Sequence, residues 1–192
     1  MNLPLGYELK VMETSEFRPL WRQGIQDVFD TTTVWVDIEG ALSEAEKAAQ
    51  KDLHALLSGR YELNLGLFYG GKLIGWSRGY QTSMSEFFMV NSAVYESHRR
   101  KGLYSFLLSE IIRRVSEKGF QTIRSSHAST NNAVIIPKLK RGFVIMGLEV
   151  HEEYGVLARL VYHFNPMRRE AMDFHSGLKR PSKDLKTLIR GI

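Results

Sequence analysis

The chain of 192 residues contains no cysteine. A disulfide framework, a zinc site built on thiolates and an acyl-enzyme formed on cysteine are therefore excluded. The absence also fits a reducing compartment, and we expect the protein to be cytoplasmic. Long apolar runs are missing as well, since no stretch approaches the roughly 20 apolar residues of a membrane span. Residues 1–8 lack the basic start and apolar core of a signal peptide, so we expect no membrane partner.

Internal repeats and low-complexity linkers are also absent, and a hydrophobic content of 43% is ordinary for a globular protein. We therefore expect one domain over residues 1–192. The net charge of +5 is unevenly distributed, because residues 166–192 contain seven Lys or Arg and three Asp or Glu. We interpret this segment as a basic, helical C-terminal extension, although such a tail could also contact nucleic acid or an acidic partner.

The pattern of apolar residues predicts a mixture of strands and helices. The expected strands are 7–12, 63–69, 72–80, 86–95, 121–126, 143–151 and 156–164. Ser43 and Glu46 have the spacing of a capping box at a helix start, and Gly70-Gly71 predicts a two-residue hairpin. Early hairpins, a β–α–β crossover in the middle and a closing hairpin predict an α+β domain on a mixed sheet.

The most informative stretch is the basic turn at residues 98–104, His-Arg-Arg-Lys-Gly-Leu-Tyr. An apolar, β-rich run leads into it, and a strongly periodic helix over residues 103–118 leaves it. Unpaired N–H groups and the helix dipole favour an anion at such a helix start. Gly102 allows a sharp turn and a close approach of the backbone to a ligand. The alternative is an ordinary basic surface loop.

This turn resembles motif A of the GCN5-related N-acetyltransferase (GNAT) superfamily, which reads Arg or Gln, two residues, Gly, one residue, then Gly or Ala. Arg99 and Gly102 match, whereas Tyr104 replaces the usual small residue. Downstream, Asn131 leads a short segment that ends in Gly142-Phe143, as is typical of the family. The similarity covers residues 85–165 and implies a three-layer α/β/α domain around a central mixed, mostly antiparallel sheet.

The resemblance implies acetyl-CoA as co-substrate, no metal, and an N-acetyltransferase in which a primary amine attacks the thioester directly. Three groups of residues would bind the cofactor. Its pyrophosphate would lie on the amides of Arg99, Arg100, Lys101, Gly102, Leu103 and Tyr104. Its pantetheine arm would lie along backbone groups of Ser92, Ala93 and Val94, and Asn131 would donate a side-chain hydrogen bond or serve only as a helix N-cap.

The catalytic acid and base are less clearly marked in the sequence. The usual acid of the family is a tyrosine seven residues after the motif Asn, and here that position holds Lys138. Lys138 could donate the proton to the leaving thiolate, contact CoA phosphates or be solvated; the substitutes are Tyr95, Tyr104 and Tyr162. Glu86 at the start of its strand is our first candidate for the base, and His127 is the second. Either could instead be structural.

The acceptor is not fixed by the sequence. The segment that covers the acceptor pocket in GNAT folds contains Trp35, Asp37 and Glu39, which together could select a cationic, partly apolar amine. Small amines, amino acids, polyamines and the N-termini or lysines of proteins all stay open as acceptors. Many members of the family dimerise, but no surface of this sequence is marked for it.

Two other classes of function stay open. The first is a non-catalytic acyl-CoA binder or regulator, which the missing tyrosine favours. The second is a nucleic-acid binder that uses the basic tail, against which the scarcity of interleaved aromatics argues. We therefore do not expect nucleic acid as a partner.

Overall fold

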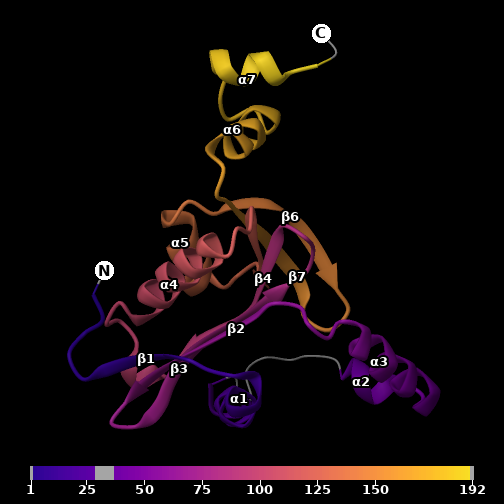
Figure 1. Cartoon of the computed structure of the whole chain (residues 1–192), viewed down its shortest axis with the longest axis vertical. Helices are drawn as coiled ribbons and strands as arrows, with labels where there is room; N and C mark the ends of the chain where they lie inside the picture. Colours follow the sequence, from indigo (N-terminus) through magenta and orange to yellow (C-terminus); the bar gives the residue numbers. More distant parts are fainter. Residues whose placement is uncertain (1, 29–36, 191–192) are drawn as a thin grey trace.

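The computed structural model describes residues 2–28 and 37–190, and one seven-stranded sheet organises them (Figure 1). The strand order is β1-β2-β3-β4-β5-β7-β6. The strands are β1 Tyr7–Val11, β2 Glu62–Tyr69, β3 Lys72–Gln81, β4 Glu86–Val94, β5 Thr122–Ala128, β6 Val144–His151 and β7 Gly155–His163. Only β4 and β5 pair in parallel. This arrangement confirms the predicted α+β class and the mixed, mostly antiparallel sheet.

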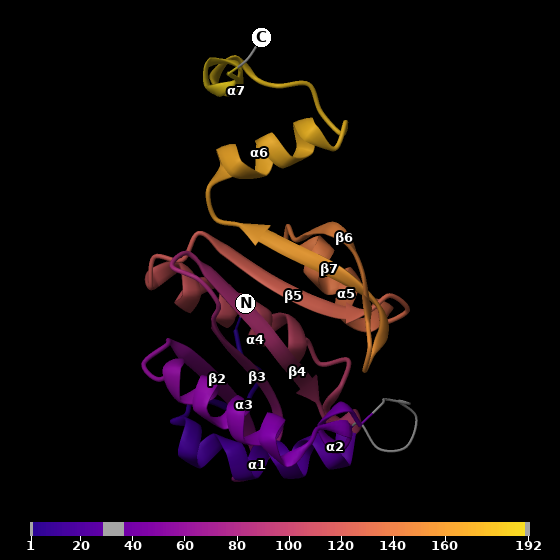
Figure 2. The ribbon, with the colours of Figure 1, turned by 90° about the vertical axis from the view of Figure 1, so that its right-hand side faces the viewer.

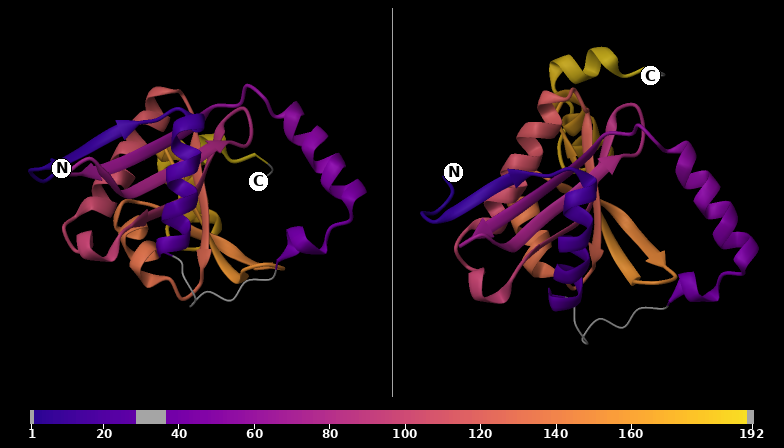
Figure 3. Two further views of the ribbon diagram at one scale, coloured as in Figure 1. Left: turned by 90° about the horizontal axis from the view of Figure 1, so that it is seen from below. Right: turned by 60° about the horizontal axis from the view of Figure 1, so that its bottom comes forward.

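Helices cover both faces of the sheet, which completes the three layers. They are α1 Thr14–Val28, α2 Ile38–Ala41, α3 Glu44–Leu56, α4 Leu103–Glu117, α5 Asn132–Lys140, α6 Pro166–His175 and α7 Lys183–Leu188. The helices α4 and α5 lie on one face, and α1 crosses β2 and β3 on the other (Figure 3). The pair α6 and α7 extends beyond the end of the sheet (Figure 2). Among the described helices, none is long and apolar enough to cross a bilayer.

Local signals in the sequence explain several boundaries. Ser43 caps α3 and forms the predicted capping box, because its hydroxyl accepts from the Glu46 amide and the Glu46 carboxylate accepts from the Ser43 amide. The hairpin between β2 and β3 turns at Gly70 and Gly71, whose φ angles are 56° and 75°. Both angles lie in the left-handed region, as a two-residue hairpin requires.

The larger hydrophobic cluster lies between the sheet and α4. Four apolar residues that share one face of α4 are at most 2% exposed, namely Leu103, Leu107, Ile111 and Val115. This packing fixes the start of α4 against the end of β4, so the basic turn between them has a defined position.

A smaller cluster joins α1 to the opposite face. Phe17 of α1 packs against Trp76 of β3 and Ala93 of β4. Gly24 is buried where α1 approaches the sheet, and a Cβ atom at that position would lie 2.7 Å from the Trp76 ring. Because glycine has no side chain, α1 can lie this close to β3, the strand that carries Trp76.

Candidate functional site

The basic turn forms a cradle of backbone amides at the start of α4. Arg100 and Gly102 have φ angles of 61° and 77°, so both lie in the left-handed region. Gly102 occupies the N-cap position without a side-chain cap, and the first hydrogen bond of the helix runs from the Phe106 amide to the Gly102 carbonyl at 3.0 Å. Within the described residues, the amides of Leu103 and Tyr104 have no backbone acceptor. These donors point at an anion-binding position.

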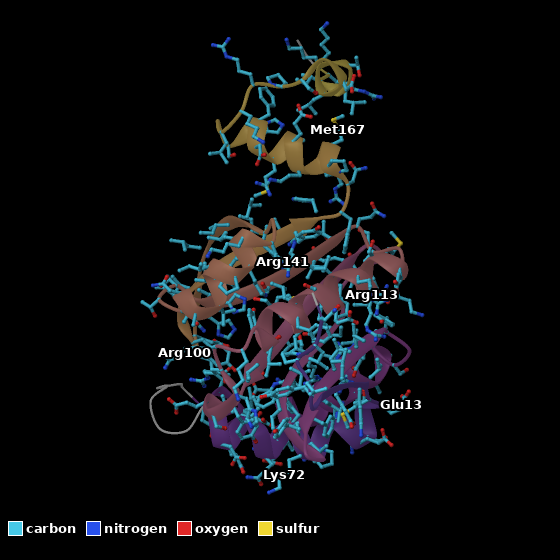
Figure 4. The ribbon with its side chains drawn as sticks, turned by 90° about the vertical axis from the view of Figure 1, so that its left-hand side faces the viewer. Glu13, Lys72, Arg100, Arg113, Arg141 and Met167 are labelled. Carbon is cyan, nitrogen blue, oxygen red and sulfur yellow. The ribbon has the colours of Figure 1, made fainter. Side chains whose placement is uncertain are left out.

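Basic side chains surround this cradle. Arg99, Arg100 and Lys101 are exposed, and Arg100 lies at the surface in Figure 4. The Nε atom of Arg99 also donates to the Val94 carbonyl at 3.0 Å, which ties the turn to the end of β4. Lys101 Nζ donates to the Tyr7 hydroxyl at 3.2 Å. The turn is therefore both positively charged and braced, as a phosphate site requires.

The strands β4 and β5 separate directly beside this cradle. They pair only over Glu86–Met89 and Thr122–Ser125. Beyond these residues β4 pairs with β3 alone, and β5 pairs with β7 alone. The backbone that follows the separation on β4 includes Ser92, Ala93 and Val94. Backbone polar groups on the two parted edges lack a strand partner, so a peptide-like chain could bind between them.

A β-bulge in β4 marks the start of this gap. Gly79 of β3 pairs with Met89, whereas the preceding Arg78 pairs with Asn91. Val90 is therefore the extra residue. A bulge re-aims backbone and side chains locally, and here it lies at the point where β4 parts from β5.

Lys138 of α5 is buried at the base of the gap. It is 1% exposed, and its Nζ atom lies 3.7 Å from the Sδ atom of Met89 and 5.2 Å from the centre of the Phe143 ring. No carboxylate of the described residues forms an ion pair with it. Burial lowers the pKa of the Lys138 ammonium to about 7, so this amine can gain or lose a proton near neutrality.

His127 lies near Lys138 on the α4 and α5 side of the sheet. Its Nε2 atom lies 3.1 Å from the Ser125 hydroxyl. Burial, and next the charge of Lys138, lowers the pKa of His127 to about 3. The imidazole is therefore neutral at physiological pH. The structure thus brings together two residues that the sequence singled out separately.

The sequence profile of the family described as "Acetyltransferase (GNAT) family" matches residues 23–143. The chain belongs to this family. The match spans the cradle, the β4–β5 gap and α5, so the resemblance predicted from motif A is confirmed. No protein of curated function matches the chain in sequence.

Solved structures of GNAT acetyltransferases share the fold. The ribosomal-protein-S18-alanine N-acetyltransferase of Escherichia coli is 18% identical with a TM-score of 0.61, and the alignment covers 83% of this chain and 94% of that one. A GNAT acetyltransferase of Streptococcus pneumoniae is 17% identical with a TM-score of 0.60, over 83% and 99%. The YncA protein of Salmonella typhimurium, solved with its cofactor acetyl-CoA, is 16% identical with a TM-score of 0.58, over 83% and 94%. At these identities the likeness shows the fold alone.

The motif Asn of the GNAT pattern has a side chain that is not used for capping. Asn131 occupies the N-cap position of α5, and its carbonyl accepts from the Ile135 amide at 3.0 Å. Its side chain makes no cap hydrogen bond. The amide group is therefore available for a ligand at the start of α5.

Glu86 lies away from the gap. It begins β4, four residues before Val90, and its carboxylate lies 2.6 Å from Arg124 Nε. The same carboxylate accepts from the Thr82 hydroxyl at 2.9 Å. The structure therefore engages Glu86 in local contacts and does not bring it to the residues around Lys138.

Two of the residues predicted for the acceptor pocket, Asp37 and Glu39, lie at the start of α2. Asp37 caps this helix by accepting from the Gly40 amide at 2.9 Å, and both Asp37 and Glu39 are exposed. Trp35 lies outside the described residues. Sequence reasoning missed Met89 and Phe143 as neighbours of Lys138, because only the register of β4 and the end of α5 bring them together. Within the described residues no cluster of His, Asp or Glu is suited to hold a metal ion.

Proposed function

We propose that the protein is an acetyl-CoA-dependent N-acetyltransferase that transfers an acetyl group to a primary amine by direct attack on the thioester. The observation that carries this proposal is the position of the unpaired amides at the start of α4, next to the gap between β4 and β5. The unpaired amides suit a pyrophosphate, and the gap between the strands suits the peptide-like pantetheine arm that follows the pyrophosphate in CoA.

The cofactor assignment follows from these two features. The pyrophosphate would bind the amides from Arg99 to Tyr104, with basic side chains around it. The pantetheine arm would pair with the edge of β4 over residues 92–94, and Asn131 would donate to it from the opposite side of the gap. The thioester would then lie near the bulge at Val90.

The reaction needs a donor for the carbonyl oxygen and a proton for the leaving group. The amine nitrogen bonds to the carbonyl carbon, and the developing oxyanion would accept from a β4 amide after Val90. The C–S bond then breaks and the CoA thiolate takes a proton. Lys138 is suited to supply it, because the pKa of its ammonium is about 7 whereas that of a thiol is about 8.5. Solvent returns the proton of the amine to Lys138.

Neither candidate for the base is well placed to take the amine proton. The pKa of His127 is about 3, which makes it a weak base at neutral pH. Glu86 is held by Arg124 at the other end of the paired segment of β4. Both stay predictions, and an acceptor that binds as the neutral amine needs neither of them.

The first experiment is a calorimetric titration with acetyl-CoA, with ATP and desulfo-CoA as comparisons. We expect micromolar binding of acetyl-CoA and none of ATP. Turnover is then measured over a panel of amines as free CoA thiol, and the absence of cysteine removes any thiol background from the protein. Absence of acetyl-CoA binding would reject the proposal.

The second candidate is a non-catalytic acyl-CoA binder. It is favoured by Lys138 at the position of the usual acid and by Tyr104 in the cradle, whose buried hydroxyl has no hydrogen-bond partner among the described residues. Tight acetyl-CoA binding with no CoA release over the whole amine panel would support this candidate over the transferase.

A further inference from the structure

Arg78 of β3 lies on the α1 face of the sheet, beside the gap. Its guanidinium carbon lies 5.0 Å from the centre of the Trp21 ring on α1. In the sheet register Arg78 pairs with Asn64 of β2 and with Asn91 of β4, the residue that directly follows the bulge at Val90. The backbone of Arg78 is therefore one strand away from the point where β4 leaves β5, and its side chain lies on the face opposite α4 and α5.

Arg78 forms no ion pair, whereas other arginines along the sheet do. Arg60 next to it pairs with Glu62, and farther across the sheet Arg124 pairs with Glu86 and Arg159 with Glu149. Among the described residues no carboxylate lies within ion-pair distance of Arg78. The groups whose charges act on it are Glu62, Arg18, Arg60 and Tyr80, and burial is the main cause of the lowered pKa of its guanidinium. Glu62 is the one carboxylate in this group, and it lies outside ion-pair distance of Arg78 and already binds Arg60 and Thr14. The half-buried guanidinium of Arg78 therefore keeps N–H donors for a further anion.

Two further donors in the same place lack an acceptor. The Nε1 atom of Trp21 is buried and has no hydrogen-bond partner among the described residues. The Oδ1 atom of Asn91 accepts from Trp76 Nε1 at 2.6 Å, which leaves the NH2 group of Asn91 as a donor. A guanidinium, an indole N–H and an amide NH2 without acceptors form a set that fits a carboxylate.

The location gives this set a role in the reaction. The pyrophosphate cradle and Lys138 lie on the α4 and α5 side of the gap, and we assign the approach of the amine to the opposite, α1 side. Arg78 lies on that side and pairs in register with the first residue after the bulge. A small acceptor with its nitrogen at the thioester could therefore reach Arg78 with its other end.

We propose that Arg78 and Trp21 bind a carboxylate of the acceptor, so that the substrate is a small amino carboxylate such as a free amino acid. This inference rests on the proposed transferase function. It differs from the cationic acceptor that Asp37 and Glu39 suggested, since those two side chains lie exposed on α2.

The test compares amino acids with their carboxamides, for example glycine with glycinamide and β-alanine with β-alaninamide. These pairs differ in the carboxylate and share the amine. In the wild type we expect kcat/KM to be at least about tenfold higher for the carboxylate of a productive pair, the size of one charged hydrogen bond. Arg78→Gln should remove this preference by lowering turnover of the carboxylate and leaving that of the carboxamide within about twofold.

Two further variants control this result. Trp21→Phe keeps an aromatic ring and removes the Nε1 donor, so it should reduce the preference in part and tests the subsite even if Arg78→Gln fails to fold. Arg113→Gln is the matched surface control, because Arg113 binds Glu110 and Glu117 on α4 and lies across the molecule from Arg100 in Figure 4. Equal turnover of carboxylates and carboxamides by the wild type, or an equal loss of both in Arg78→Gln, would overturn the subsite.

Failure of the transferase proposal would be recognised separately. If acetyl-CoA binds and no amine releases CoA, the CoA-loaded protein is titrated with the same amino carboxylates by calorimetry. Saturable binding that disappears in Arg78→Gln would support the carboxylate subsite without catalysis. No binding of any amino carboxylate would overturn it.

Discussion

The Nζ atom of Lys138 lies 3.7 Å from the Sδ atom of Met89, and the two residues are 49 positions apart in the chain. The contact joins α5 to the last residue of β4 that still pairs with β5. A thioether is a weak acceptor, so Met89 does not replace a carboxylate as a partner for the ammonium. Lys138 is therefore a buried amine whose proton is loosely held, at the place where the proposed reaction needs one.

Lys138→Met tests the proposed acid. The change keeps a long side chain and removes the proton donor, so kcat should fall about 100-fold, as is usual for loss of a general acid. The acetyl-CoA affinity measured by calorimetry should stay within about threefold. The alkaline limb of the wild-type kcat profile should also disappear in the variant. Retained turnover would show that thiolate release needs no acid from this residue.

The same variant tests the cost of burying the ammonium. In the folded protein the pKa of Lys138 is about 7, and in the unfolded chain it returns to about 10.4. The unfolded state therefore binds more protons between these values, and wild-type stability rises with pH across this window. Lys138→Met should be more stable than wild type at pH 6, and the gain should shrink between pH 7 and 10. Urea unfolding at several pH values measures this difference, and a gain independent of pH would contradict the burial effect.

Gly102→Ala tests the amide cradle. No atom lies within 4 Å of a Cβ built at Gly102, so the cost arises from its φ of 77° and not from a collision. A left-handed alanine costs about 1–2 kcal/mol, and relaxation of the turn should weaken acetyl-CoA binding at least about tenfold.

Gly119→Ala is the matched control for this change. Gly119 follows the other end of α4, has a φ of 88° and is equally open around its Cβ position. It should lose similar stability and keep its acetyl-CoA affinity. Equal affinities in both variants would count against the cradle.

Glu86→Gln separates a base from a structural residue. The contact with Arg124 at 2.6 Å leads us to expect a loss of about 1 kcal/mol in unfolding free energy. The pH profile of kcat/KM should be unaltered, since Glu86 lies before the gap. A profile shifted to higher pH would instead restore Glu86 as the base.

Gly24→Ala tests the fit of α1 on the sheet. Alanine raises helix propensity by up to about 1 kcal/mol, but its Cβ would lie 2.7 Å from the Trp76 ring. Overpacking against a buried indole costs about 1–3 kcal/mol, so the variant should be destabilised. The double variant Gly24→Ala with Trp76→Leu should lose less than the sum of the two single changes. Additive losses would show that the two sites are independent.

Local chemistry explains which elements were predictable from the sequence. The capping box at Ser43 and the Gly70-Gly71 turn are confirmed because each depends on neighbours in the chain. The helix start at Thr14 shows the opposite case. The residue types of Thr14 and Ser15 favour the N-cap position, but both residues lie within the helix, and the Thr14 hydroxyl donates to Glu62 of β2 at 2.8 Å. A hydrogen bond to another strand thus uses the hydroxyl that would otherwise cap the helix.

The residues of the candidate site also fall into those that short-range sequence features predict and those that depend on distant contacts. The cradle and the motif Asn could be found because a turn and a helix start are short-range features. The environment of Lys138 could not, since its neighbours Met89 and Phe143 come from β4 and from the loop after α5. The state of Arg78 was equally hidden, because Glu62, the carboxylate whose charge acts on it, forms its ion pair with Arg60.

The short pairing between β4 and β5 has a mechanical consequence. Four residue pairs join the half-sheet β1–β4 to the half-sheet β5–β7. Between β4 and β5 the backbone ladder is therefore short, and the two halves are joined mainly by the hydrophobic cluster that they share. A ligand bound in the gap would add hydrogen bonds to β4 and β5 where the two strands do not pair with each other. Amide hydrogen exchange on β4 beyond Met89 would then slow when the ligand binds, and the melting temperature of the protein would rise.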